Sequence, residues 1–540
     1  FDIPQRQVYE VKENETQIYF EKVTNLLIDR DDNNEGGAVS FEDAILSGFT
    51  NISFSDSLSN ASATYGDGTR AYAQGVVNGK GVESTHITGG RLYASANSLQ
   101  MNSLSFKGTL FGGRNTAMAK RVTGRTYYDI GSAKEDSRLT LSNVLLEEGS
   151  RIYGGGNASL EDQTLTHRNI SVTIADTYVG QGVSIYGAGH ISAENGAIAA
   201  SSVTLDIEST NGDSRSGNIY AGGYTASTGG SVTISGNVST TIRGGHFNYT
   251  GNGTRTKTGN SSEQGASTLR IEGGTFDGPV YAGGFTMGGE AVVNGSTLLE
   301  ISGGTFTKEI YGGCGANKAK LGSYALIDGS ANTRIVAGED AIRFCGGLFA
   351  GSYGAGTILG SDGVGTTLTF TGNGDVIEWD DDSNVYGCCQ LSRGAITGSR
   401  ELIFDAFSNS QCKSFGTLDE KNGFDTVRAI NGSDVTFSRP ALLSSVASWN
   451  LELGSTLSWE GGSAELCNDV GDDSINISGL DDSVADSTLL TGCTILNWEN
   501  AYVSFNGGEQ CRCSNGIYTD GTYRLWLDGD SVKVGMLASA

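Results

Sequence analysis

"STLRIEGGTFDGPVYAGGF" (267–285) and "STLLEISGGTFTKEIYGGC" (296–314) are nearly the same phrase written twice. The matching residues are thirty positions apart: Leu269 with Leu299, Ile271 with Ile301, Phe276 with Phe306, and Tyr281 with Tyr311. A fixed offset of this size is typical of a structural unit that stacks on copies of itself. The sequence therefore predicts a repeat protein.

The second half of the phrase recurs more widely, as a β-branched residue, a tyrosine and then small residues. It appears at Tyr153, Tyr186, Tyr220, Tyr281, Tyr311 and Tyr386. A degenerate copy surrounds Phe349, and the longest gap holds a divergent copy near Phe247. With the Phe349 copy included, the steps are 33, 34, 61, 30, 38 and 37 residues, and the step of 61 contains the divergent copy.

Alternating stretches precede most copies, for example "ISVTIAD" from Ile170 and "SVTLDIE" from Ser202. Alternation with a period of two indicates a strand with one buried face, so we expect Ile271 and Ile301 to point inward. Each unit then consists of two or three short strands joined by glycine-rich corners. A propeller blade needs four strands, and these units are too short for one. We expect an all-β fold, a parallel β-helix (β-solenoid).

The composition agrees with a stack of strands and corners. Glycine accounts for 81 of the 540 residues and proline for 3. Glycine adopts the corner conformations easily, whereas proline would remove a donor from strands that are bonded on both sides. The net charge of −26 disfavours nucleic acid and anionic membranes as partners. No apolar run is long enough for a transmembrane helix, so we expect no membrane insertion.

Three regions are expected along the chain. Residues 1–60 would hold N-terminal strands that form a cap or the first coils, residues 61–400 the glycine-rich coils, and residues 401–540 a continuation and cap. Residues 1–20 would cap their own first coil or add a strand to a neighbouring molecule, because the end of a solenoid exposes unpaired backbone groups. We therefore expect self-association into an oligomer or filament.

The repeated tyrosine is the most regular side chain of the unit. If the preceding Ile or Val points inward, the tyrosine points outward and stacks as a ladder on successive coils. Two interpretations stay open: a flat aromatic strip for sugars or another subunit, and a ladder that stabilises the solenoid itself.

All nine cysteines lie in the second half of the chain, and none forms a CxxC pair, which argues against a zinc ribbon. They are Cys314, Cys345, Cys388, Cys389, Cys412, Cys467, Cys493, Cys511 and Cys513. Disulfides in an oxidising, extracellular place are the better interpretation. Cys314 and Cys389 both stand three residues after the repeated tyrosine, so we expect some bridges between neighbouring coils. The numbering starts at Phe1, which fits a mature chain whose leader was removed.

The "GGTF…VYGG" coils, together with "EGGAV" (35–39) and the closing "GTYRLWLDGDSVKV" (521–534), resemble passenger regions of bacterial autotransporters and related surface adhesins. "EGGAV" is similar to the GGA[ILV] repeats of chlamydial polymorphic membrane proteins. The resemblance covers roughly residues 140–400 and the C-terminus. It implies a right-handed β-helix at the cell surface. The chain departs from it in ending "GMLASA", without a membrane barrel or its terminal aromatic residue.

Candidates for chemistry are sparse. His190 in "AGHIS" is the one match to the segments of galacturonase-type β-helix enzymes, and we interpret it as a corner residue. Carboxylates for glycoside cleavage occur in "EWDDDSN" (378–384), "NDVGDDS" (468–474) and "GLDDSVAD" (479–486), which we interpret as solvated loops. A calcium loop is the one cofactor candidate, because residues of EF-hand type stand at the correct spacing, namely Asp31, Asn33, Glu35, Gly36 and Glu42.

The sequence thus predicts a secreted, extracellular structural protein that is adhesin-like or filament-forming and has no catalytic activity. Two alternatives remain. One is a polysaccharide-degrading β-helix enzyme, and the other is a carbohydrate-binding trimeric spike, with a glycan or a host-cell surface as the ligand.

Overall fold

The computed structural model describes residues 25–28, 39–40, 51–54, 62–64, 70–78, 86–113, 135–208, 217–317, 323–361, 363–381, 383–390, 395–409, 417–418, 423–437, 446–460, 464–466, 473–495 and 497–537. The chain divides into two compact units, which are described separately. Unit 1 comprises Phe1–Pro279, Gly283–Gly295 and Ala316–Ala325, and unit 2 comprises Val280–Ala282, Ser296–Gly315 and Leu326–Ala540. Parallel, stacked strands make a β-solenoid, which confirms the expected fold class.

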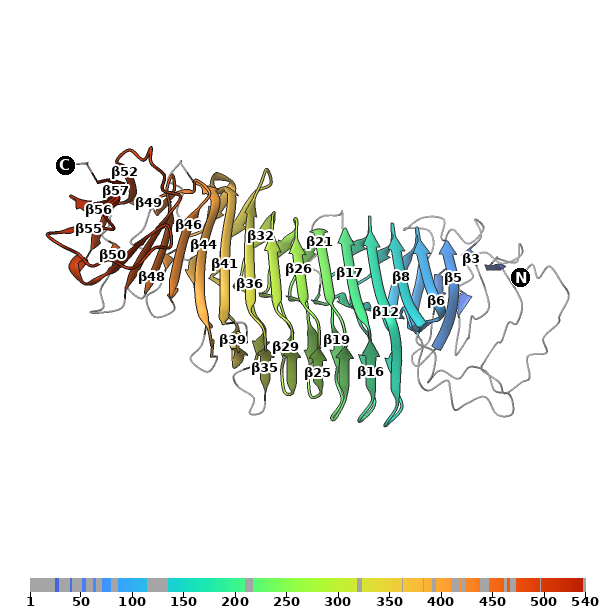
Figure 1. The fold of residues 1–540 in the computed structure, drawn as a ribbon. Helices are drawn as coiled ribbons and strands as arrows, with labels where there is room; N and C mark the ends of the chain where they lie inside the picture. Colours follow the sequence, from blue (N-terminus) through green and yellow to red (C-terminus); the bar gives the residue numbers. More distant parts are fainter. Residues whose placement is uncertain are drawn as a thin grey trace, which may run out of the picture. The chain divides into compact units, whose positions relative to one another are not determined.

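Strands of successive coils lie side by side in unit 1. Figure 1 shows this for β8 (Glu135–Ser142), β12 (Thr164–Ala175), β17 (Ser202–Glu208), β21 (Val238–Gly244) and β26 (Ser267–Ile271). All four neighbouring pairs are parallel; two are in continuous register, and the other two, β8 with β12 and β17 with β21, each contain one register shift. The inward positions of this row hold Leu139, Val172, Leu205, Thr240 and Leu269.

Parallel pairing already occurs near the N-terminus. Strand β1 (Asn25–Ile28) pairs with β3 (Asn51–Phe54), and β3 pairs with β5 (Arg70–Asn78). These described strands therefore pair in the same parallel way as the later coils. Residues 1–20, the proposed assembly arm, lie outside the described residues.

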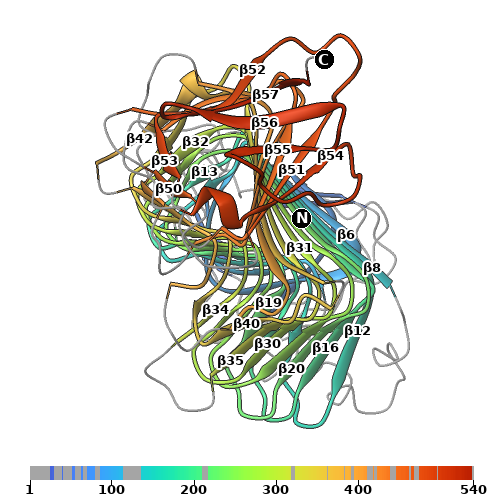
Figure 2. The ribbon, with the colours of Figure 1, turned by 60° about the vertical axis from the view of Figure 1, so that its left-hand side comes forward.

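One coil of unit 1 contains more strands than the sequence predicted. Between Ser231 and Thr256 the chain forms five: β20 (Ser231–Ile234), β21, β22 (His246–Phe247), β23 (Thr250–Gly251) and β24 (Thr254–Thr256). The preceding coil supplies partners in β16 (Ala197–Ala200), β17, β18 (Ile219–Tyr220) and β19 (Gly223–Thr225). In Figure 2, β12, β16 and β20 follow one another along the edge of this part. The extra strands have only two or three residues, too few for alternation to reveal them.

The glycines after the repeated tyrosine are needed because backbone and side chains approach closely there. A Cβ on Gly154 would lie 2.4 Å from Val172 Cγ2 and 2.1 Å from the Gly187 carbonyl oxygen. The next coil repeats the situation, where a Cβ on Gly187 would lie 2.8 Å from Val203 Cγ1. The corner therefore packs directly on the inner face of the long strand, and only glycine leaves room for it.

Unit 2 continues the same stacking beyond residue 400. One inward column runs through β31 (Thr297–Ile301), β36 (Ala331–Ala337), β41 (Val364–Asn373), β44 (Ser399–Ser408), β46 (Thr426–Ile430), β48 (Ser448–Glu452), β51 (Ser474–Ser478) and β54 (Tyr502–Phe505). Its buried residues are Leu299, Thr333, Leu368, Leu402, Val427, Trp449, Ile475 and Val503.

The pairing changes direction at the C-terminal end of unit 2. Strand β57 (Ser531–Met536) runs antiparallel to β52 (Ser487–Thr491) and to β56 (Tyr523–Asp528), and β55 (Ile517–Thr519) is antiparallel to β56. This hairpin sheet uses backbone groups that would otherwise form an open edge. The chain therefore supplies its own C-terminal cap.

Candidate functional site

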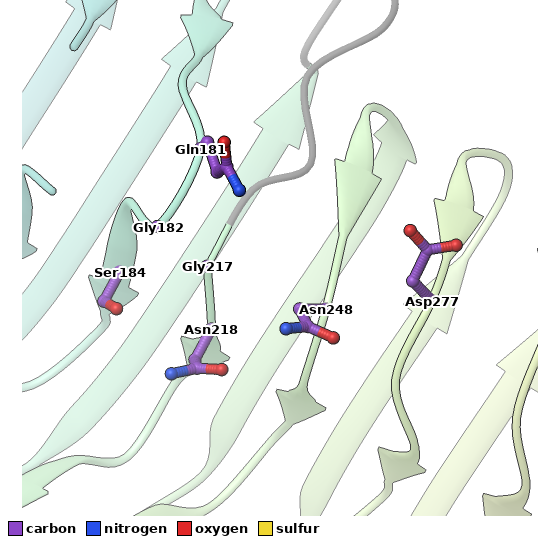
Figure 3. Close-up of a pocket in the computed structure, with 7 residues that line it drawn as sticks. All are labelled: Gln181, Gly182, Ser184, Gly217, Asn218, Asn248 and Asp277. Atoms are coloured by element: carbon purple, nitrogen blue, oxygen red, sulfur yellow. The ribbon is translucent and has the colours of Figure 1, made fainter. Parts of the chain in front are cut away.

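A polar groove with a volume of 420 Å³ lies on the surface of unit 1. Figure 3 shows the seven residues that line it, which come from successive segments of the stack: Gln181, Gly182, Ser184, Gly217, Asn218, Asn248 and Asp277. Six of the seven are uncharged, and Asp277 contributes a carboxylate.

Backbone pairing between coils holds the lining residues in place. The amide of Ile185 donates to the carbonyl oxygen of Asn218 at 2.7 Å. The amide of Asn248 donates in turn to the carbonyl oxygen of Gly217 at 3.1 Å. Because these are ladder bonds between neighbouring coils, the lining side chains repeat at roughly the 4.8 Å spacing of paired strands.

Two neighbouring coils approach closely at the lining residue Gly217. A Cβ on Gly217 would lie 1.8 Å from the carbonyl oxygen of Val183, so any other residue would displace the backbone.

The carboxylate of Asp277 has a defined partner. Its Oδ2 lies 2.7 Å from His246 Nε2, and both side chains are partly exposed. Since His246 begins β22 and Asp277 follows β27 (Thr275–Phe276), a residue of one coil orients the groove residue of the next.

Two exposed tyrosines flank the groove segments. Tyr249 directly follows Asn248 and is 41% exposed. Its carbonyl oxygen accepts from the amide of Ile219 at 2.8 Å, so Tyr249 stands beside Asn218 in the next coil. Tyr178, 37% exposed, is in β13 (Tyr178–Val179), just before Gln181.

The repeated tyrosines stack as predicted, but they do not form an exposed strip. Rings lie face to face for Tyr153 with Tyr186 (4.9 Å between centroids), Tyr186 with Tyr220 (6.0 Å) and, in unit 2, Tyr281 with Tyr311 (5.2 Å). These five side chains are buried, and Tyr386 is half-buried against Phe349 at 4.3 Å. The expectation that the repeated tyrosine points outward is therefore wrong for these five, and burial excludes an exposed aromatic strip at their positions.

A second ladder, on the strands that follow the glycine corner, covers the tyrosines. His190 lies 5.2 Å from Tyr153, and Tyr224 lies 5.3 Å from Tyr186. The guanidinium of Arg255 lies 5.6 Å from the Tyr220 ring. The ladder residues His190, Tyr224, Arg255 and Phe285 are register partners in β15 (His190–Ile191), β19, β24 and β29 (Phe285–Thr286). His190, the residue that matches galacturonase-type enzymes, therefore packs on aromatic rings. Burial of the ladder raises the pKa of Tyr220.

Cys314 and Cys389 do occupy equivalent positions, but an intervening coil separates them. Ser352 lies between them, with its hydroxyl 3.6 Å from Cys314 Sγ and its amide donating to Cys389 Sγ at 3.4 Å. No disulfide joins any two of the seven cysteines in the described parts of the chain. Cys412 and Cys467 lie outside those parts, so disulfide formation stays a prediction.

The described acidic residues of the three acidic runs do not converge. Asp380 pairs with Arg343 at 3.0 Å, and hydrogen bonds from Cys345 and then Arg343 lower its pKa. Asp486 pairs with Arg524. Among the described residues no group of three His, Cys, Asp or Glu side chains is arranged to hold a metal. The calcium candidate at 31–42 lies outside them, apart from the backbone of residues 39–40.

Glu263, which the sequence analysis did not single out, is 2% exposed. Its Oε1 accepts from the amide of Thr254 at 3.0 Å, and burial raises the pKa of this carboxyl to about 8. In register it stands between Ile234 and Val293, at an apolar position of the repeat. The three paired strands are β20 ("SVTI"), β25 (Asn260–Glu263, "NSSE") and β30 (Glu290–Val293, "EAVV"). When these segments are aligned, the last position is Ile, Glu and Val, and this is the sequence signal for Glu263.

Comparison with known proteins finds no match among family models, curated proteins or solved structures. Among the described residues, no helix has the length and apolar character needed to cross a membrane.

Proposed function

We propose that this chain is a secreted, adhesin-like surface protein whose β-solenoid is a non-catalytic scaffold. The observation that carries the proposal is the doubled ladder in unit 1, in which Tyr153, Tyr186 and Tyr220 are covered by His190, Tyr224 and Arg255. Six large side chains are used here for packing between coils. The regular aromatic residues thus stabilise the stack, while the turns differ from coil to coil. Such a stack is suited to displaying its turns.

The C-terminal cap favours display over filament growth. Strands β55 to β57 close the described C-terminal end with antiparallel pairing. A filament that grows by adding strands at a coil edge needs an open edge. In the described part of unit 2, the edge of β52 is instead paired with the antiparallel strand β57.

An enzymatic function is favoured by one observation, the His246–Asp277 pair at the groove. A histidine oriented by a carboxylate can act as a general base. Hydrolysis of a glycosidic bond, however, uses two carboxylates on either side of the bond, and Asp277 is the one carboxylate among the lining residues.

The experiment has two arms. The purified protein is incubated with a panel of plant and bacterial polysaccharides while reducing ends and unsaturated products are measured, and intact source cells are labelled with an antibody to the chain. We expect no turnover and strong labelling of intact cells. If the wild-type protein cleaved a polysaccharide and Asp277→Asn abolished this activity, the protein would be an enzyme and not a non-catalytic scaffold. Antibody labelling seen only in lysed cells would refute surface display.

A further inference from the structure

We propose that the groove formed by Gln181, Ser184, Asn218, Asn248 and Asp277 binds a neutral, linear oligosaccharide that runs along the stack. The inference deepens the proposed adhesin-like function and rests on it for its biological setting. The binding itself depends only on the groove.

The chemistry of the lining selects hydroxyl groups. The side chains of Gln181, Asn218 and Asn248 each present an amide with both donors and an acceptor, and the Ser184 hydroxyl does both as well. The carboxylate of Asp277 accepts only. A sugar hydroxyl also donates and accepts, so it can satisfy all of these groups. An apolar ligand would leave them unpaired, at a cost that disfavours its binding.

The arrangement of the lining selects a linear ligand. Ser184, Asn218 and Tyr249 come from three successive coils that are joined by ladder hydrogen bonds. Their spacing is therefore set by strand pairing, at roughly 4.8 Å per coil. The lining residues Ser184, Asn218, Asn248 and Asp277 thus present polar groups on four successive coils, which suits a ligand that extends along the stack. The volume of 420 Å³ lies within the roughly 300–1,000 Å³ range of small-molecule sites.

Electrostatics select a neutral sugar. The lining contains a carboxylate and no cationic side chain, and the whole chain carries a net charge of −26. Both features repel acidic polysaccharides such as polyuronates. The pairing of Asp277 with His246 at 2.7 Å fixes the orientation of the acceptor without filling the groove.

Tyr249 supplies an apolar face next to these polar groups. It is 41% exposed, and its backbone pairs with the coil of Asn218. A tyrosine ring offers a large contact area with a polar tip, and the C–H face of a pyranose ring can pack on it. Tyr249 is not itself a lining residue, but it directly follows Asn248 and is the exposed aromatic residue that the test includes.

The test is a calorimetric titration of the full chain with cellohexaose, xylohexaose and mannohexaose, and with hexagalacturonic acid as the charged counterpart. We expect at least one neutral hexasaccharide to bind, and Asn218→Ala or Asn248→Ala to raise its Kd about tenfold. Tyr249→Ala should weaken binding, and Tyr249→Phe should preserve it. The control is Gln163→Ala, an exposed residue outside the lining, which should leave the Kd unchanged.

Three results would overturn the inference: no binding of any neutral hexasaccharide at millimolar concentration, tighter binding of hexagalacturonic acid, or equal affinities for Asn248→Ala and Gln163→Ala. Thermal melts of each variant separate loss of the site from loss of the fold. If no oligosaccharide bound but intact cells were labelled normally, the sugar-binding proposal would be refuted and the surface-protein proposal would stand. Turnover of a polysaccharide would instead refute the scaffold.

Discussion

The thiol of Cys314 and the hydroxyl of Ser352 lie 3.6 Å apart in neighbouring coils of unit 2. Ser352 therefore occupies the position from which a cysteine would reach Cys314. The coil spacing of roughly 4.8 Å falls within the approximately 4.4–6.8 Å Cα separation of disulfides.

Ser352→Cys is expected to form a disulfide with Cys314 or Cys389 under mild oxidation. Peptide mapping without reductant should recover the linked pair. Ser330→Cys, at another buried serine of unit 2 whose hydrogen-bond partners are Ser296 and Asn332, is the matched control and should give no such link. If all cysteines of the Ser352→Cys variant could still be alkylated after oxidation and denaturation, residues 314, 352 and 389 would not be stacked as described.

Tyr153 tests the role of the buried ladder. Tyr153→Ala removes a ring that stacks on Phe111 and Tyr186 at 4.9 Å, and should lower the free energy of unfolding by about 3–5 kcal/mol. Tyr153→Phe keeps the ring and should cost much less. Chemical denaturation of both variants measures the difference. Equal stabilities for the two would mean that ring stacking contributes nothing.

Ile271 tests the inward face. It is fully buried, so Ile271→Asp would place an unpaired charge in the core at a cost of several kcal/mol. Arg270→Asp, at the exposed neighbouring position, is the control. Thermal melts should separate the two variants by many degrees, and coincident melts would contradict the assigned face.

Glu263 predicts a pH dependence with a definite sign. Its pKa is about 8 in the folded chain against 4.5 as a free side chain, because burial penalises the charged form. Between these values the folded state binds the extra proton, so stability falls as the pH rises from about 4.5 to 8. The total loss is at most about 5 kcal/mol.

Glu263→Gln removes this titration, so the stability difference between variant and wild type should grow in favour of the variant as the pH rises. Urea denaturation at pH 5 and pH 9 measures it. Every other carboxylate is shared by the two proteins and cancels in the comparison. A difference that is the same at both pH values would show that Glu263 does not titrate in this range.

The repeat, the parallel fold and the inward position of Ile271 and Ile301 were predictable from the sequence, because each depends on local alternation or on a fixed offset. The burial of Tyr186 was not predictable from the sequence. The residue that covers it, Tyr224, belongs to a strand beyond the glycine corner. The groove was unpredictable for the same reason. Asn218 and Asp277 are far apart in sequence, and only the coil geometry places them in one lining.

The antiparallel cap on strands β52 to β57 has an evolutionary consequence. New coils can arise by duplicating a segment of about thirty residues, such as the two phrases that begin at Ser267 and Ser296. A copy inserted ahead of the cap extends the stack and keeps the same terminus, whereas a copy added after it meets a strand that runs the wrong way. Duplication within the stack therefore adds coils and leaves the antiparallel strands β55 to β57 unchanged.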